Sequence, residues 1–270
     1  MTGSGTQTDP YIIWDWEDFF NISDSTCYYK LGCNLDANDY NNGVWTTCTL
    51  ICAELDGNGH IVRNINNTST ASNKYAIDIT AACTIKNLTL KQCLQTSGTT
   101  TMYGFFAGTA NVTKNFINCN FEISAPCIFQ TGTASGNYIF DVCTLSFDCE
   151  KISALASYQK GRLYRSDLHI NASSSPNLLG FTVINTSRIT GNVNCTAATL
   201  TFGYNGGTTN SVIAINTNAN IDIEGNASSP TVVDADLCAA VSGTGALAAT
   251  TAQMQSAEWL NTNGFAVIAV

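Results

Sequence analysis

The chain offers few of the residue types that carry out chemistry. Its 270 residues include two histidines, twelve cysteines, twenty acidic and eleven basic side chains. His60 and His169 are the only imidazoles, and no His/Cys spacing resembles a zinc site. The sequence contains no Gly-x-Ser-x-Gly elbow, P-loop or dinucleotide fingerprint. We therefore expect no metal, no cofactor and no catalytic residues.

Carboxylates are the remaining candidates for catalysis, because enzymes that cleave glycosidic bonds use a pair of them. Aligning the repeats described below puts no concentration of acids in either outward column that we compared. Asp167 and Arg188 are predicted to be neighbours on adjacent coils, about 4.8 Å apart. We interpret them as a surface ion pair, with a catalytic acid and its basic partner as the alternative. A second acidic group, which we interpret as a solvated face, comprises Asp141, Asp148 and Glu150.

The segment Asp56-Gly57-Asn58-Gly59-His60 has oxygen atoms that could contact calcium or a sugar. It supplies fewer oxygen ligands than a calcium loop needs. The segment therefore predicts a tight turn with its glycines at positive φ.

The cysteines are few enough, for a chain of this length, to be buried thiols rather than a disulfide scaffold. Cys119 and Cys143 fall in the same predicted inward column of successive coils, where they could stack as thiols or form a disulfide. Other candidate pairs near the N-terminal end are Cys27 with Cys33 and Cys48 with Cys52. The sequence leaves the choice between thiols and disulfides open.

A short pattern recurs along the chain. It comprises an apolar residue, two others, a small or apolar residue that we call the corner residue, and then apolar residues at alternate positions. The corner residues are Ile65, Leu88, Cys119, Cys143, Ser166, Ser187 and Ala219. Four of the six intervals are 21 to 24 residues long. The two longer intervals include Gln95–Thr113 and Leu200–Ser211, which are rich in Thr and Gly and are expected to be loops.

Repeats of this length predict a solenoid or a propeller. Each copy has only one or two short strands, so a parallel β-helix is favoured over a four-stranded propeller blade. An antiparallel sandwich or barrel is the alternative. We expect the coil to be right-handed, following the general crossover preference of parallel strands.

The predicted organisation is one solenoid with a cap at each end. Residues 1–10 form an N-terminal arm, 11–60 the N-terminal cap and entry, 61–250 the parallel β-helix and 251–270 the C-terminal cap. Asp15 is the predicted N-cap of a short helix with an apolar face. Thr251–Leu260 is predicted to be a second short helix that stops at Asn263-Gly264. The tail Phe265–Val270 is predicted to pack back as a strand.

The N-terminal third resembles the start of GLUG-type and related bacterial and phage β-helix proteins. The matching residues are Tyr11-Ile12-Ile13, Trp16-Glu17-Asp18-Phe19, Tyr29-Lys30-Leu31, Asn34-Leu35-Asp36 and Leu55 to Val62. The resemblance covers roughly residues 10–90 by motif. It implies a β-helix and a surface adhesin, a carbohydrate-associated protein or a virion component. For virion proteins of this type it also implies a homotrimer, with the oligomeric state left open.

Composition excludes several partners. The net charge is −9 and the eleven basic residues are scattered, so the chain has little with which to neutralise a run of phosphates. No apolar run reaches the length that spans a bilayer. We therefore expect neither nucleic acid nor membrane as a partner. The segment Met1–Gly5 shows no secretory signal pattern.

We expect a non-enzymatic structural or attachment protein on a bacteriophage virion, such as a capsid decoration, head fibre or tail-associated protein. Its 85 Asn, Thr and Ser side chains suit contacts with glycans or with other virion or surface proteins. The candidate contact residues are Tyr103, Phe105, Phe106 and Tyr204, with covering of the core as their alternative role. The alternative functions are a polysaccharide-degrading β-helix enzyme and a secreted bacterial surface adhesin.

Overall fold

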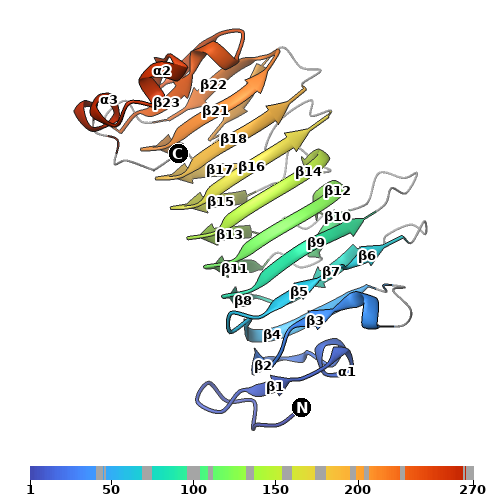
Figure 1. The fold of residues 1–270 in the computed structure, drawn as a ribbon. Helices are drawn as coiled ribbons and strands as arrows, with labels where there is room; N and C mark the ends of the chain where they lie inside the picture. Colours follow the sequence, from blue (N-terminus) through green and yellow to red (C-terminus); the bar gives the residue numbers. More distant parts are fainter. Residues whose placement is uncertain are drawn as a thin grey trace.

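The computed structural model shows a mostly β protein, a parallel β-solenoid of about seven turns with only short helical pieces. It describes residues 1–40, 45, 47–68, 75–95, 104–108, 112–131, 137–153, 160–173, 181–194, 199–203, 207–225, 229–263 and 265. The coils stack in chain order from the N-terminal end to the C-terminal helices (Figure 1). The fold class predicted from the repeat is confirmed, while the handedness of the coil stays a prediction.

Two walls extend along most of the solenoid. Wall A contains β1 (Tyr11–Ile13), β2 (Ser23–Leu31), the end of β4 (Cys48–Asp56), β8 (Cys83–Lys86), β11 (Thr113–Ile117), β13 (Asn137–Asp141), β15 (Lys160–Tyr164), β17 (Phe181–Asn185) and β20 (Thr208–Thr209). Wall B contains β3 (Leu35–Asp36), β5 (Ile61–Arg63), β9 (Thr89–Gln95), β12 (Asn120–Thr131), β14 (Thr144–Ser153), β16 (Asp167–Ala172), β18 (Arg188–Val193), β21 (Val212–Thr217), β23 (Thr231–Asp234) and β25 (Ala246–Ala249).

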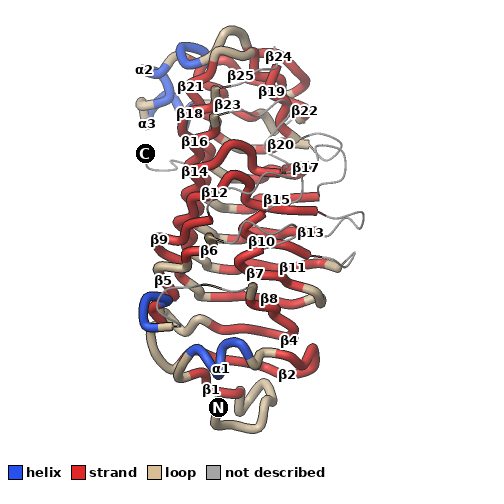
Figure 2. The backbone as a smooth tube through the Cα atoms, turned by 90° about the vertical axis from the view of Figure 1, so that its right-hand side faces the viewer, coloured by secondary structure: helices blue, strands red, loops and turns tan. Residues whose placement is uncertain are grey.

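Further strands follow wall B and precede the next strand of wall A, so they form a third wall (Figure 2). Its N-terminal section comprises the start of β4, β7 (Tyr75–Ile79), β10 (Gly104–Gly108) and the end of β12. Its C-terminal section comprises β19 (Thr199–Phe202), β22 (Asn220–Glu224) and β24 (Val241–Thr244). The short β6 (Asn66–Asn67) pairs with the end of β9. All these strand pairings are parallel, as expected for a solenoid.

The alternation of side chains explains why these segments form strands with one face inward. In β14, Leu145 and Phe147 are buried, whereas Ser146 between them is partly exposed and Thr144 and Asp148 on either side are exposed. The side-chain period of two in a strand directs the apolar set toward the interior of the coil. The same alternation recurs from coil to coil, so each inward residue packs on its counterparts above and below.

The predicted column register is correct in the central coils and wrong at both ends. Thr144 pairs with Asn120 and Asp167, as the repeat alignment predicts. The next corner residue after Ser187 is Ser211, because β18 pairs with β21. Ala219, predicted to be that corner, instead adjoins β22 of the third wall. At the other end, Ile65 is out of register with Leu88, because Ile61 pairs with Thr89.

The observed strands also correct the prediction that two long intervals of the repeat are loops. Leu200–Ser211 contains β19 and β20, which continue the third wall and wall A. In Gln95–Thr113, the described segment Gly104–Gly108 is β10 of the third wall. Both excursions therefore contain wall strands, and Thr and Gly content alone does not separate a loop from a polar strand.

Stacked aromatic rings fill the core of the middle coils. Phe116 and Phe140 occupy paired positions on β11 and β13, and their ring centroids are 4.8 Å apart with an interplanar angle of 9°. Phe106 and Phe129 stack in the third wall at 5.8 Å. All four side chains are at most 4% exposed. Parallel in-register pairing places like residues one above another, which favours this stacking.

The turn between walls A and B repeats a left-handed backbone conformation. The residue before each corner has a φ of 46° to 57° at Asn87, Asn118, Val142, Arg165, Thr186 and Asn210. Asn tolerates this conformation better than most residues. The side chains of Asn87 and Asn118 also bond coil to coil, with a distance of 2.8 Å from Nδ2 of Asn118 to Oδ1 of Asn87. These turns therefore have both a conformational and a hydrogen-bonding reason to contain Asn.

Val142 is the β-branched exception at this turn, with φ at 57° and a side chain 48% exposed. We expect Val142→Asn to raise the free energy of unfolding by about 1 kcal/mol, because a β-branched residue in the left-handed region is strained. The new amide would also lie one coil from Asn118. Urea denaturation of the variant and the wild type measures the change. Val142→Ala, which removes the β-branch without adding an amide, is the control, and an Asn variant less stable than wild type would contradict the prediction.

Capping elements lie at both ends, as predicted, with differences in detail. The Asp15 carboxylate accepts a hydrogen bond from the backbone N–H of Asp18 at 2.8 Å, which confirms it as the N-cap of α1 (Trp16–Phe20). The predicted helix Thr251–Leu260 is two helices, α2 (Thr251–Met254) and α3 (Ala257–Thr262). Ser256 causes the break, because its side chain caps a new helix. The described residues also form two 3-10 turns, η1 (Ala37–Asp39) and η3 (Ala235–Leu237). Residues 266–270 lie outside the described residues.

The segment Asp56–His60 forms the predicted tight turn, but its residues at positive φ are Asn58 and Gly59. The Asp56 carboxylate accepts a hydrogen bond from the N–H of Asn58 at 2.8 Å. Gly57 is needed for another reason, since a Cβ there would collide with the backbone of Asn87 and Leu88 in the next coil. This segment therefore connects walls A and B within one coil and packs closely against the same turn of the next coil.

Candidate functional site: a groove on wall B

The candidate contact residues are not a shared surface site. Phe105 and Phe106 are 0% and 1% exposed, and their rings pack edge to face at 5.0 Å. The expectation that they contact a glycan or partner is therefore corrected, because a buried ring offers no surface. They cover the core, which is the alternative role considered for them. Tyr103 and Tyr204 lie outside the described residues.

The outer face of wall B has a hollow over β9, β12 and β14. Its volume is about 390 Å³, and its outward-facing lining includes Gln92, Glu122, Ser124, Ser146 and Asp148. The strand alternation directs these side chains outward, while the intervening residues of the same strands fill the core. The lining thus combines an amide, two hydroxyls and two carboxylates from three successive coils.

A second hollow of about 260 Å³ adjoins the first and shares Ser124 and Asp148 with it. It is also lined by Gln95, Pro126 and Ser173. We call the two hollows together the wall-B groove. The groove crosses several coils, so it has the elongated form that a chain-like ligand would need.

A β-bulge shapes the groove. Gln92 has a φ of 52°, and the register of β9 against β12 shifts between Phe121 and Ile123. The bulge inserts one extra residue into β9, which bends the strand and turns the Gln92 side chain toward the hollow. The bulge therefore contributes to the concave shape of the wall at this point.

Glu122 and Asp148 are close neighbours on the outer face. Glu122 pairs with Ser146, and Asp148 lies two residues further along the same strand as Ser146. This diagonal relation corresponds to a Cα separation of roughly 8 Å. Both residues are exposed and line the same hollow. The repeat alignment placed them in separate columns, and only the diagonal across the coils brings them together.

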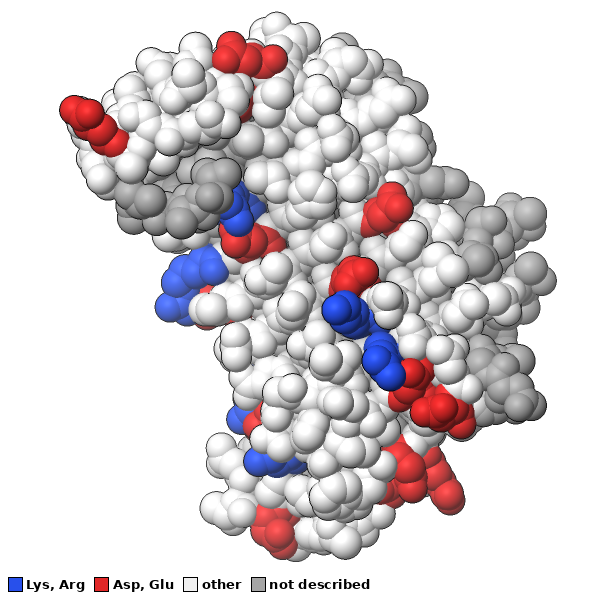
Figure 3. Space-filling view, in the orientation of Figure 1, with Lys and Arg blue, Asp and Glu red and all other residues white. Residues whose placement is uncertain are grey.

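The rest of this face has few charges. Figure 3 shows charged side chains in several small, separate groups, one of them a diagonal row across the middle and lower coils, with uncharged surface between the groups. One row of paired positions across the coils continues from Glu122 through Ser146 and His169 to Thr190. The Nδ1 atom of His169 is 3.1 Å from the hydroxyl oxygen of Thr190. The groove therefore offers a ligand mainly hydrogen-bonding groups rather than a strong electrostatic field.

The predicted neighbours Asp167 and Arg188 do pair in register on β16 and β18. Two hydrogen bonds join them, from Nε of Arg188 to Oδ1 at 2.9 Å and from Nη2 to Oδ2 at 3.0 Å. Both carboxylate oxygens are thus engaged by the guanidinium, and the ion-pair interpretation is confirmed. Because both side chains are partly exposed, the pair adds little to stability.

The cysteines of the described residues are free thiols. Cys48 and Cys52 are four residues apart on one extended strand, roughly 10–13 Å, which exceeds the reach of a disulfide. Cys27 and Cys33 are six residues apart in the sequence. The extended strand β2 covers Cys27 to Leu31, so it separates the two side chains. Neither of these two predicted pairs is in bonding geometry.

Cys119 and Cys143 stack at the corner, where their neighbours Asn120 and Thr144 pair in register. The Cys143 thiol donates to the carbonyls of Phe116 and Asp141 at 3.4 and 3.5 Å. A hydrogen bond between the two thiols lowers the pKa of Cys143 and raises the pKa of Cys119. The structure thus shows them as stacked thiols with defined hydrogen-bond partners.

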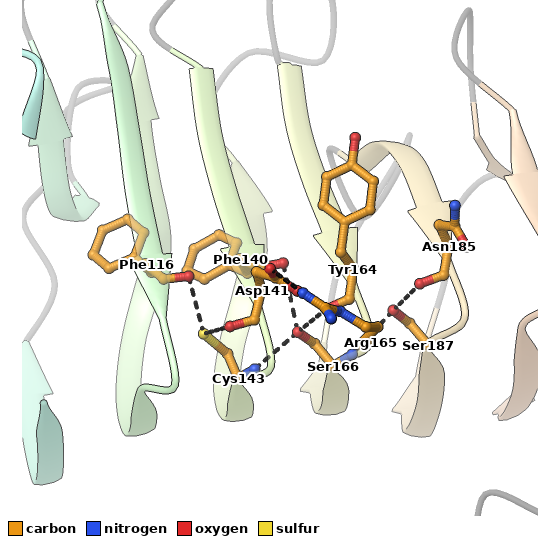
Figure 4. Close-up of polar contacts among 9 residues, drawn as sticks. All are labelled: Phe116, Phe140, Asp141, Cys143, Tyr164, Arg165, Ser166, Asn185 and Ser187. Carbon is orange, nitrogen blue, oxygen red and sulfur yellow. Dashed lines mark hydrogen bonds and ion pairs between the residues drawn. The ribbon is translucent and has the colours of Figure 1, made fainter. Parts of the chain in front are cut away.

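The stack of thiols continues as a stack of serines, and we call the whole set the corner ladder: Cys119, Cys143, Ser166, Ser187 and Ser211. Figure 4 shows its middle section, Cys143, Ser166 and Ser187. Each side chain donates to the carbonyl two residues before it, as Ser166 does to Tyr164 at 2.6 Å. Each serine hydroxyl also accepts the backbone N–H of the preceding corner residue, as Ser166 does from Cys143 at 2.9 Å. The ladder satisfies buried backbone groups at a corner where no strand partner is available.

Sequence reasoning missed a second thiol contact, between Cys52 and Cys83. The two residues lie on the paired strands β4 and β8 of neighbouring coils, both side chains are buried, and each thiol shifts the pKa of the other. The missing signal was the register of β4 against β8, in which Glu54 pairs with Thr84. The four-residue turn between β4 and β5 hides this register, because it lengthens that copy of the repeat.

No group of three or more His, Cys, Asp or Glu side chains that could hold a metal ion occurs among the described residues. In that same part of the chain, no helix has the length and apolar character to cross a membrane. Comparisons of the chain with protein-family models, with curated proteins and with solved structures found no match.

Proposed function

We propose that the protein is a non-enzymatic attachment protein that holds a glycan chain in the wall-B groove. The observation that carries this proposal is the hollow of about 390 Å³ lined by amide, hydroxyl and carboxylate groups from three coils. Sugar hydroxyls both donate and accept hydrogen bonds, so they are complementary to these groups. Leu94, which lines the hollow and is 38% exposed, offers an apolar patch for the C–H face of a sugar ring.

The solenoid supports this role because it holds the lining residues on paired strands rather than on loops. Side chains fixed by backbone pairing and core packing lose little conformational entropy when they bind a ligand. The uncharged, Asn- and Thr-rich surface suits a protein exposed outside a cell. We therefore propose that the protein is located on a bacteriophage virion, where other virion or surface proteins are its neighbours.

The first test is binding to a glycan panel, followed by titration with the best ligand. We expect Glu122→Gln and Asp148→Asn each to weaken the affinity about tenfold, because a hydrogen bond to a charged group contributes about 1.5–3 kcal/mol. Glu258→Gln makes the same chemical change on an exposed residue of α3 and is expected to leave the affinity unchanged. No binding to any glycan, or equal weakening by the control, would count against the proposal.

A polysaccharide hydrolase is the second candidate, because Glu122 and Asp148 are two carboxylates in one hollow. Glycosidases use a proton-donating acid and a second carboxylate that flank the scissile bond. The same panel distinguishes the two functions, since an enzyme would release new reducing ends and a binding protein would not. Loss of that release in Glu122→Gln, with binding retained, would establish the enzyme instead.

A further inference from the structure

The contact between Cys52 and Cys83 lies beside a buried lysine. Lys114 pairs in register with Cys83 on the neighbouring strand, and its side chain is 0% exposed. Its Nζ atom has no hydrogen-bond partner within the part of the chain that the structure describes, and it lies 5.0 Å from the ring centroid of Tyr138. An ammonium group in this position is costly unless a nearby group offsets its charge. The carboxylate of Asp78 is one such group, and a thiolate at Cys83 would supply a second opposite charge.

The two thiols have the separation that a disulfide needs. Because Glu54 pairs with Thr84, Cys83 is level with Ala53 and diagonal to Cys52. Strand spacing puts the Cα atoms of this diagonal roughly 6 Å apart, within the range of disulfides. Both side chains are buried, at 0% and 4% exposure, so both point to the core side of these paired strands. Two coils could therefore be joined with little backbone movement.

The two members of the pair are not equivalent. The hydrogen bond from Cys52 and the charge of Lys114 lower the pKa of Cys83, against the effect of burial. The pKa of Cys52 is raised by its bond to Cys83, by burial and by the carboxylate of Glu54. The thiolate is the nucleophile in thiol oxidation. Cys83 is therefore suited to attack an oxidant, and Cys52 is suited to react with the oxidised Cys83 and close the disulfide.

We propose that Cys52 and Cys83 are a modification site at which a peroxide forms a disulfide between two coils, with Lys114 positioned to favour the Cys83 thiolate. The Cys83 sulfur attacks one peroxide oxygen, the O–O bond breaks, and the second oxygen departs with a proton as water or an alcohol. The Cys52 sulfur then attacks the resulting sulfenic acid, and water leaves with the Cys52 proton. The peroxide is reduced and the two thiols are oxidised, so electrons and atoms balance.

The proposal selects this pair over Cys119 and Cys143. The thiols of Cys119 and Cys143 donate to backbone carbonyls, so a disulfide there would remove two thiol donors. No cation is among the interactions that shift the pKa values of that pair. Lys114 beside Cys83 is the asymmetry that distinguishes the two thiol contacts.

The test is treatment of the folded chain with hydrogen peroxide, alkylation of the remaining thiols, and peptide mapping without reductant. We expect a linked peptide containing Cys52 and Cys83, which disappears on reduction and in Cys52→Ser. Cys48→Ser removes a buried thiol from the same strand and is expected to leave the linkage intact. A wild type that stays folded by circular dichroism and shows no such peptide, or shows a Cys119–Cys143 peptide instead, overturns the proposal.

The role of Lys114 has its own measurement, the pH dependence of the oxidation rate. Lys114→Met is expected to slow oxidation at least several-fold near neutral pH and to move its rise to higher pH, whereas Lys114→Arg keeps the charge and is expected to stay closer to wild type. The other titratable groups facing this cluster are Asp78 of β7, Glu54 of β4 and Tyr138 of β13. Equal pH profiles for Lys114→Met and wild type, both folded, would remove Lys114 from the proposal.

Discussion

Phe140→Ala is expected to lower the free energy of unfolding by about 3–5 kcal/mol, the largest effect that we predict for a single side chain. Phe140 is 0% exposed, stacks on Phe116 at 4.8 Å and approaches Phe129 at 5.6 Å. Truncation removes the buried ring and leaves a cavity between coils. The stacked neighbours are held by the pairing of their own strands, so they can close the cavity only in part.

Urea denaturation followed by circular dichroism measures this loss. Phe140→Leu keeps most of the apolar volume and is expected to cost clearly less. Ile117→Ala, on the same wall but 40% exposed, is a matched control that is expected to change stability by less than about 1 kcal/mol. If Phe140→Ala cost no more than this control, the stacked core would not be a main source of stability.

Ser166→Ala is expected to lower the free energy of unfolding by about 1–3 kcal/mol, although it removes only one oxygen. The hydroxyl of Ser166 is buried, accepts the backbone N–H of Cys143 at 2.9 Å and donates to the carbonyl of Tyr164 at 2.6 Å. Alanine leaves the buried N–H of Cys143 without this acceptor. The cost arises from this loss of a backbone partner and not from lost apolar packing.

Ser166→Cys is the matched comparison, because Cys119 and Cys143 occupy the same corner in the preceding coils. A thiol donates and accepts weakly, so the variant is expected to be more stable than Ser166→Ala and less stable than wild type. Thermal or urea unfolding of the three proteins gives this order. An alanine variant as stable as wild type would show that the corner ladder contributes nothing measurable.

Much of the fold was predictable from local patterns. In the repeat copies whose corner residues are Cys143 and Ser166, the alternation of apolar and polar residues indicates which side chains face inward. The regular interval between copies indicates that the coils stack in parallel. The same interval predicted the pairing of Asp167 with Arg188, which the structure confirms. The cap at Asp15 was also predictable, because an acidic N-cap is a local signal.

The candidate site was much less predictable. Glu122 and Asp148 are near each other only across a diagonal between coils, and the bulge at Gln92 is invisible in a pattern of period two. The contact of Cys52 with Cys83 depends on how many residues the turn after β4 takes up. Ala219 was assigned to the wrong wall for the same reason, since β19 and β20 fill an interval that looked like a loop.

The sequence by itself thus determined the architecture and the inward or outward direction of the side chains in the central coils. Only the tertiary structure decided where wall B is hollowed, which thiols meet and which aromatics are buried. The physical reason is that alternation reports one strand's own faces, whereas contacts between coils depend on register. Register is set by turn lengths, bulges and core packing acting together, and a change of one residue reverses which face a side chain occupies.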